Sequence, residues 1–180
     1  MLVDLDTVII CYIGMYLLVK LGFFVAGRKR IESLSRIEII RFLFGLYIAI
    51  VFGITVFPIE FPLMQMDAGY AEYVNMQLFS FLREGWSTSF IRQVGGNLLI
   101  FVPLYPLAVW SGMPEKRWPQ ALVRIAGCSF LIELLQFLEN VIGLTGFFGR
   151  ISDVNDIFLN TLGGMMGFGA VYLYQKSRRR

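Results

Sequence analysis

Seven polar residues lie inside or beside apolar segments in the second half of this chain, and side chains of these types can bind a polar ligand or exchange protons. They are Asn97, Glu133, Gln136, Arg150, Asp153, Asp156 and Asn160. Glu133 and Gln136 are three residues apart, a spacing that keeps both on one face of a helix. The two aspartates and Asn160 follow at intervals of three and four, which gives a second helix a polar face of the same kind.

Acid–base chemistry in this set would fall to the carboxylates. The chain contains no histidine, which excludes a Ser-His-Asp triad and any imidazole proton shuttle. Glu133 is therefore the candidate general acid or base, with Asp153 or Asp156 as its partner. The candidate ligand-binding residues are Asn97, Gln136, Arg150 and Asn160. Asp153 and Asp156 could hold a divalent ion, but with Glu133 they are a thin set of ligands. We therefore assign no metal ligand, and we expect no cofactor.

Most of these residues also have a purely structural explanation. Asp153 could be the N-cap of a helix and Asp156 an acid in its first turn, where both stabilise the positive end of the helix dipole. The asparagines and Gln136 could form hydrogen bonds between helices. Glu133 is harder to explain in this way, because a carboxylate in hydrocarbon costs about 2.5–3.5 kcal/mol on insertion scales. We therefore expect Glu133 to face the interior of a helix bundle.

The composition of the chain is that of a membrane protein. Of its 180 residues, 57% are hydrophobic and 16% are charged, against roughly a quarter charged in soluble domains. Five apolar stretches approach the roughly 20 residues that a helix needs to cross a bilayer; they cover about 6–26, 37–57, 94–112, 119–140 and 154–174. The predicted fold class is all-α, a single domain over 1–180 built as a polytopic bundle of five transmembrane helices.

Lysine and arginine collect on one side of these spans. The loops after the first and third spans, together with the C-terminal tail, hold Arg28, Lys29, Arg30, Arg36, Lys116, Arg117, Lys176, Arg178, Arg179 and Arg180. Because cytoplasmic loops carry an excess of basic residues, we predict that the N-terminus is outside and the C-terminus is cytoplasmic. The basic tail then serves as a topology anchor, and the net charge of +3 gives no reason to expect a nucleic-acid partner.

This orientation places the polar residues at a common depth. The fourth and fifth spans run in opposite directions, so Glu133 late in one span and Asp153 early in the next both lie in the outer half of the membrane. Asn97 opens the third span on the same side. We predict that all seven residues converge in one outer-half pocket, with Arg150 as the cation that bridges the acids.

Three further features shape the expected bundle. Pro103 and Pro106 cannot donate backbone hydrogen bonds, so the third span should bend there. Gly163 and Gly167 form a small-residue pattern that lets two helices approach closely. The outer segment before the third span mixes aromatic and charged residues; it is either an interfacial anchor or a lid, and we predict that about 67–90 covers the pocket.

Taken in order, three motifs resemble those of the VanZ-like family. They are Asn97-Leu-Leu-Ile-Phe-Val-Pro103-Leu, Ser129-x-x-x-Glu133-x-x-Gln136, and Gly149-Arg150-x-x-Asp153-x-x-Asp156-x-x-x-Asn160-Thr-x-Gly163-Gly164. Upstream, Asn75-Met-Gln-Leu78-Phe79 is similar to a shorter family element that has a proline at the position of Leu78. The resemblance covers about 70–165, the motif core of the single domain.

The resemblance implies a multi-pass protein of the bacterial inner (plasma) membrane, because the founding member of the family is linked to low-level resistance to the lipoglycopeptide teicoplanin. Two functions remain open. The protein could bind a membrane lipid, a lipid-linked envelope precursor or the antibiotic itself in the outer-leaflet pocket. Alternatively, it could be a membrane enzyme that uses Glu133 with Asp153 or Asp156 on a lipid-linked substrate. Transport is disfavoured, because five spans without internal repeats lack the usual transporter architecture.

Overall fold

Five segments of the described chain are long and apolar enough to cross a membrane. The structure is a computed structural model, and it describes residues 2–25, 35–57, 59–60, 70–115, 117–144 and 151–179. Four spans are single helices, α1 (Leu5–Val25), α2 (Arg36–Val56), α5 (Trp118–Ile142) and α6 (Val154–Arg178), and the remaining span combines α3 (Thr88–Phe101) with α4 (Leu104–Trp110). The predicted all-α membrane fold with five spans is therefore confirmed, while its orientation stays a prediction.

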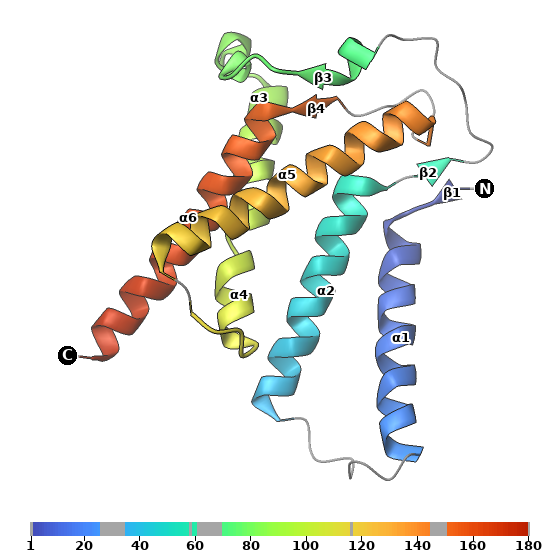
Figure 1. The fold of residues 1–180 in the computed structure, drawn as a ribbon, viewed down its shortest axis with the longest axis vertical. Helices are drawn as coiled ribbons and strands as arrows, with labels where there is room; N and C mark the ends of the chain where they lie inside the picture. Colours follow the sequence, from blue (N-terminus) through green and yellow to red (C-terminus); the bar gives the residue numbers. More distant parts are fainter. Residues whose placement is uncertain are drawn as a thin grey trace.

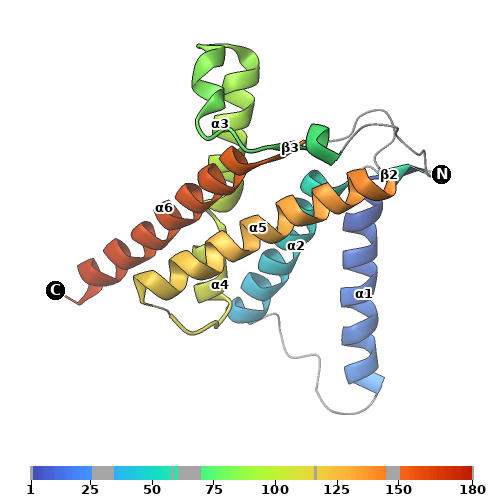
Figure 2. The ribbon, with the colours of Figure 1, turned by 45° about the horizontal axis from the view of Figure 1, so that its top comes forward.

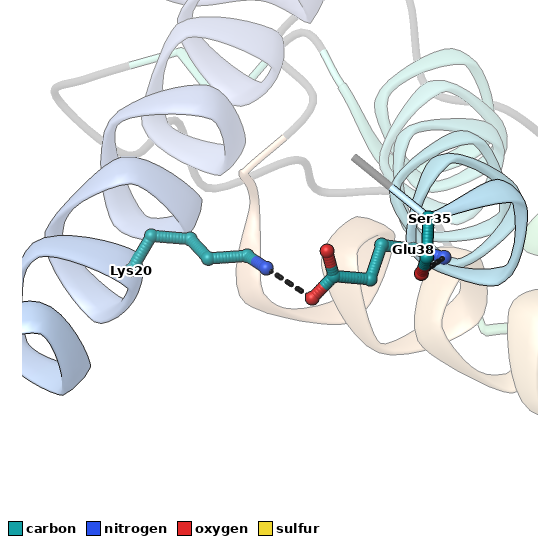
Figure 3. Close-up of polar contacts among 3 residues, drawn as sticks. All are labelled: Lys20, Ser35 and Glu38. Carbon is teal, nitrogen blue, oxygen red and sulfur yellow. Dashed lines mark hydrogen bonds and ion pairs between the residues drawn. The ribbon is translucent and has the colours of Figure 1, made fainter. Parts of the chain in front are cut away.

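Short polar caps set where the spans begin. The Ser35 hydroxyl accepts a hydrogen bond from the backbone N–H of Glu38 at the start of α2, and the Glu38 carboxylate pairs with Lys20 of α1 at 2.6 Å (Figure 3). Ser87 caps α3 in the same way by accepting from the N–H of Phe90. This cap lets the third span begin six residues earlier than the apolar pattern suggested, because a capped helix can continue through the polar pair Arg92 and Gln93.

The third span is interrupted at Val102 and Pro103, as its prolines predicted. Proline removes the amide that would bond the carbonyl four residues earlier, which weakens the helical ladder at this level. Helix α2 supports the interruption on both sides. The Tyr47 hydroxyl donates to the carbonyl of Ile100 above it, and Arg41 Nε donates to the carbonyl of Ser111 below it at 3.0 Å.

Helix α6 forms the centre of the packing. It contacts α3, α4 and α5, whereas α1 packs along α2 at the opposite edge of the molecule (Figures 1 and 2). The buried core lies where α3 meets α5, at Phe101, Ala121 and Ile125. A side chain at Gly163 or Gly167 would collide with backbone carbonyls of α3, so the small-residue pattern is a packing surface, as predicted.

Two short strand pairs tie the outer segments to the helices. β1 (Leu2–Val3) pairs antiparallel with β2 (Ile59–Glu60), and β3 (Val74–Asn75) pairs in parallel with β4 (Ser152–Asp153). Two-residue strands carry no alternating pattern that a sequence could reveal. The second pair brings the outer segment, with its 3₁₀ turns η1 (Tyr70–Tyr73) and η2 (Ser80–Glu84), to the start of α6.

Candidate functional site

The carboxylate of Asp153 is the centre of a network of side-chain amides. Its Oδ2 accepts hydrogen bonds from Asn75 Nδ2 at 2.9 Å and from Gln93 Nε2 at 3.2 Å. Its Oδ1 accepts from the backbone and side-chain nitrogens of Asn155 at 2.8 and 2.7 Å. Asp153 is thus the predicted N-cap of α6, but it also joins β3 and α3 to that helix.

Two further carboxylates adjoin Asp153. Gln93 Nε2 also lies 3.3 Å from Asp156 Oδ1, so one amide bridges both aspartates. The buried Glu133 of α5 accepts from the backbone N–H of Asp153 through Oε2 at 2.8 Å. We call these three acids, together with their donors Asn75 and Gln93, the amide–carboxylate cluster. It brings β3, α3, α5 and the start of α6 to one point.

Asn155 fixes the outer segment above this cluster. Its side chain is fully buried, donates to the carbonyl of Gln77 and the hydroxyl of Ser80 at 2.9 and 2.8 Å, and accepts from the N–H of Phe79. Phe79 has a φ of 63°, a left-handed conformation that costs energy in a residue with a side chain. Its ring packs edge-on against Phe158 of α6. Asn155 therefore holds a strained turn in place.

A cavity of about 260 Å³ lies beside the cluster, between β3, α5 and the start of α6. Its walls are Val74, Met76, Phe130, Leu134, Phe137, Val154 and Ile157, and the polar residues Glu133, Ser152 and Asp153 also border it, but the surface of the cavity is apolar. Val74 and Met76 belong to the outer segment, so this part of the segment does cover a pocket. The residues from Ser80 onward rise instead along α3 (Figure 2).

The seven predicted residues do not all share this pocket. Gln136 Nε2 donates to the carbonyl of Thr55 on α2 at 2.8 Å, and Asn160 Nδ2 donates to the Ser129 hydroxyl at 3.1 Å. Both are hydrogen bonds between helices, the structural alternative for these residues. Within the part of the chain that the structure describes, the side chain of Asn97 forms no hydrogen bond. Arg150 lies outside the described residues.

Three residues of the site, Gln93, Asn75 and Asn155, were not among the predicted site residues. Gln93 has a signal in hindsight, because it lies four residues before Asn97 and therefore on the same side of α3. Asn155 lies between the two aspartates, and Asn75 opens the upstream motif. Among the described residues, no group of three or more His, Cys, Asp and Glu side chains could hold a metal ion.

The motifs that meet in this cluster fall inside a known family region. The family model described as VanZ/LLP1 matches residues 44–175, more than half of the chain. The chain belongs to the VanZ/LLP1 family. The VanZ/LLP1 region begins within α2 and includes every member of the amide–carboxylate cluster, whereas α1 precedes it. Neither a curated protein nor a solved structure matches the chain.

Proposed function

We propose that this VanZ/LLP1 protein lies in the bacterial plasma membrane and binds a lipid-linked or lipidated envelope ligand in the outer half of its bundle. Binding there would contribute to resistance against lipoglycopeptides of the teicoplanin type. The ligand would be a membrane lipid, an envelope precursor on a lipid carrier, or the antibiotic itself.

One observation carries this proposal: an apolar cavity lies directly beside the amide–carboxylate cluster, between membrane-spanning helices. Ligand sites are typically apolar pockets with a few convergent polar groups that fix the orientation of the ligand. Seven apolar side chains form the walls of the cavity, and the acids Glu133 and Asp153 border it on one side. An amphiphile with an apolar chain and a polar end matches this division.

The hydrogen bonds of Asp153 favour binding over acid–base catalysis. An ionised carboxylate offers about four acceptor sites, and the two oxygens of Asp153 accept four hydrogen bonds from amides. A general base must instead accept a proton from its substrate at hydrogen-bond distance. Asp153 is therefore suited to hold the geometry of the site, and it is a poor partner for the acid–base role proposed for Glu133.

The substitution Glu133→Gln distinguishes the two functions, because glutamine keeps hydrogen bonds but cannot exchange protons. We expect the variant to retain the lipid that co-purifies with the wild type, measured by mass spectrometry, and to keep most of its effect on teicoplanin susceptibility. Glu72→Gln, at an exposed residue of η1, is the matched control.

Two results would contradict binding. The first is a Glu133→Gln variant that keeps its lipid but is as susceptible as a strain without the gene, as acid–base catalysis requires. The second is wild-type protein whose lipids match the bulk membrane, with no envelope lipid or added lipoglycopeptide enriched.

A further inference from the structure

We infer that the cavity between β3, α5 and the start of α6 is a groove for a single hydrocarbon chain, acyl or isoprenoid, which enters sideways from the outer leaflet. We call it the chain groove, with the ten lining residues given above. This inference rests on the proposed function, since it names the part of the ligand that the cavity holds.

The exposure of the wall residues indicates the direction in which the groove opens. Three of its wall residues are substantially exposed: Met76 by 76%, Phe130 by 54% and Leu134 by 39%. Phe130 and Leu134 are four residues apart and so lie on one face of α5, a helix long and apolar enough to span a membrane. Around such a helix the neighbours of an exposed apolar side chain are lipid chains. The groove is therefore open to the bilayer.

Two tryptophans indicate the depth of the groove relative to the membrane interface. Trp86 and Trp110 bracket the span formed by α3 and α4, and they are 91% and 49% exposed. Tryptophan is enriched at both membrane interfaces, so the hydrocarbon layer begins near Thr88. Gln93 follows five residues later, about 7–8 Å deeper at 1.5 Å per residue. Because Gln93 contacts Asp153, the groove beside Asp153 lies within the layer of lipid chains.

The volume and the apolar lining of the groove restrict what it can hold. A volume of about 260 Å³ lies just below the range of about 300–1,000 Å³ that is typical for pockets enclosing a drug-sized molecule. Seven of the ten lining residues are apolar. A polar glycopeptide core would leave its hydrogen-bonding groups unsatisfied against these walls. A linear hydrocarbon chain satisfies both constraints.

Photo-crosslinking from inside the groove tests this inference. Phe130 is replaced by benzoylphenylalanine in the full chain, and Phe52 of α2, which is 40% exposed and outside the groove, receives the same residue as a matched control. A third variant carries it at Leu134, in case the Phe130 variant folds poorly. Each protein is reconstituted in vesicles of phosphatidylglycerol and phosphatidylethanolamine with a trace of polyprenyl phosphate or of a decanoylated glycopeptide. Adducts are identified by mass spectrometry after illumination.

We expect the groove positions to enrich one chain-bearing probe about tenfold over its mole fraction, the ratio that 1.4 kcal/mol of preference produces. The probe at Phe52 should report the bulk composition. Enrichment of polyprenyl phosphate supports a lipid-carrier ligand, and enrichment of the acylated glycopeptide supports the antibiotic. A third outcome is that the protein is transferred into detergent and still gives phospholipid adducts from position 130 but not from position 52. This result would support the groove and contradict the proposed envelope ligand.

The inference fails if the groove positions and Phe52 give adducts in the same bulk proportions, because the groove would then be ordinary lipid-facing surface. It also fails if only Phe52 gives lipid adducts, because the groove would then be closed to the bilayer. Neither result depends on whether Glu133→Gln retains its phenotype, so failure of the groove and failure of the proposed function can be told apart.

Discussion

At the scale of single residues, the site depends on neutral amides as much as on its acids. Gln93 bridges two carboxylates, and Asn75 and Asn155 supply further donors to Asp153. Such amides satisfy negative charge without adding a formal positive charge, and buried polar groups that are fully hydrogen-bonded define one conformation. The amide residues should therefore be as sensitive to substitution as the acids themselves.

Asn155→Ala should destabilise the protein strongly. The variant removes the side-chain partner of the Phe79 N–H and of the Gln77 carbonyl, and each buried unsatisfied group costs about 1–3 kcal/mol. We expect the free energy of unfolding in detergent to fall by about 2–4 kcal/mol. The control is Gln77→Ala, which removes an exposed side chain that accepts a hydrogen bond from Arg83 Nη1 and keeps the backbone carbonyl that Asn155 bonds. Equal stability of Asn155→Ala and the control would contradict the role assigned to Asn155.

The role of Arg150 as the cation beside the acids remains a prediction from the sequence. Arg150→Ala should abolish the resistance phenotype, because it removes a cation expected beside three acids, and Arg150→Lys should restore it only in part, since lysine lacks the planar fork that bridges two carboxylates. Drug susceptibility at matched expression, measured by immunoblotting of membranes, checks both. Full activity of Arg150→Ala would remove Arg150 from the site.

At the scale of elements, close contact between α3 and α6 holds the cluster together. The two helices run in the same direction, with Gly163 against Leu98 and Gly167 against Val102. The carbonyl of Val102 lacks its helical amide partner because residue 106 is proline, and Gly167 lets α6 approach this carbonyl directly. The same approach brings Gln93 within reach of Asp153 and Asp156.

Gly163→Ala should therefore disrupt the site from a distance. The added methyl group would meet the backbone of Leu98, which cannot rotate away as a side chain could. Overpacking of this kind typically costs about 1–3 kcal/mol, and we expect a loss of at least that size in thermal or denaturant unfolding in detergent.

Gly169→Ala on the same helix is the matched control. No atom lies within 4 Å of the added methyl group, and alanine is favoured over glycine in a helix by up to about 1 kcal/mol. This control should be neutral or slightly stabilising. If both variants behave alike, the close approach at Gly163 does not contribute to stability.

At the scale of the whole molecule, the two ends of the bundle differ in charge and in structure. The N-terminus and the strand pairs lie at one end, and the C-terminus lies toward the other (Figure 1). Lys176, Arg178 and Arg179 close α6 at this second end. Because basic residues favour the cytoplasmic side, the strand end with the amide–carboxylate cluster should face outward.

Cysteine labelling tests this orientation. The two native cysteines are first removed by Cys11→Ala and Cys128→Ala. In this protein, expressed in intact cells that have no outer membrane, Leu2→Cys should react with a membrane-impermeant maleimide. Ser177→Cys, an exposed position near the C-terminus, should react only after permeabilisation. The opposite pattern would invert the topology and would move the cluster and the chain groove to the inner leaflet.

The sequence by itself determined the membrane-spanning helices. Long apolar stretches predict helices in lipid because hydrocarbon cannot satisfy an open backbone, and the caps at Ser35 and Asp153 and the break at Pro103 depend on neighbours in the chain. Local spacing likewise identified the polar face with Asp153 and Asp156 and the packing surface with Gly163 and Gly167. The third span was set too short at its start, since the polar pair Arg92 and Gln93 masked a helix that Ser87 starts. The fifth was set too short at its end, because α6 continues into the basic tail as far as Arg178.

Only the tertiary structure decided which polar groups meet. Helical spacing placed Glu133 and Gln136 on one face, yet Glu133 bonds the start of α6 while Gln136 reaches α2. Asn75 joined the site through a strand pair of two residues, too short to leave a pattern in the sequence. Asn155 joined it from the first turn of α6, beside the N-cap Asp153. Hydrogen-bond partners depend on the rotation and crossing of packed helices, and these are fixed by contacts between residues far apart in the chain.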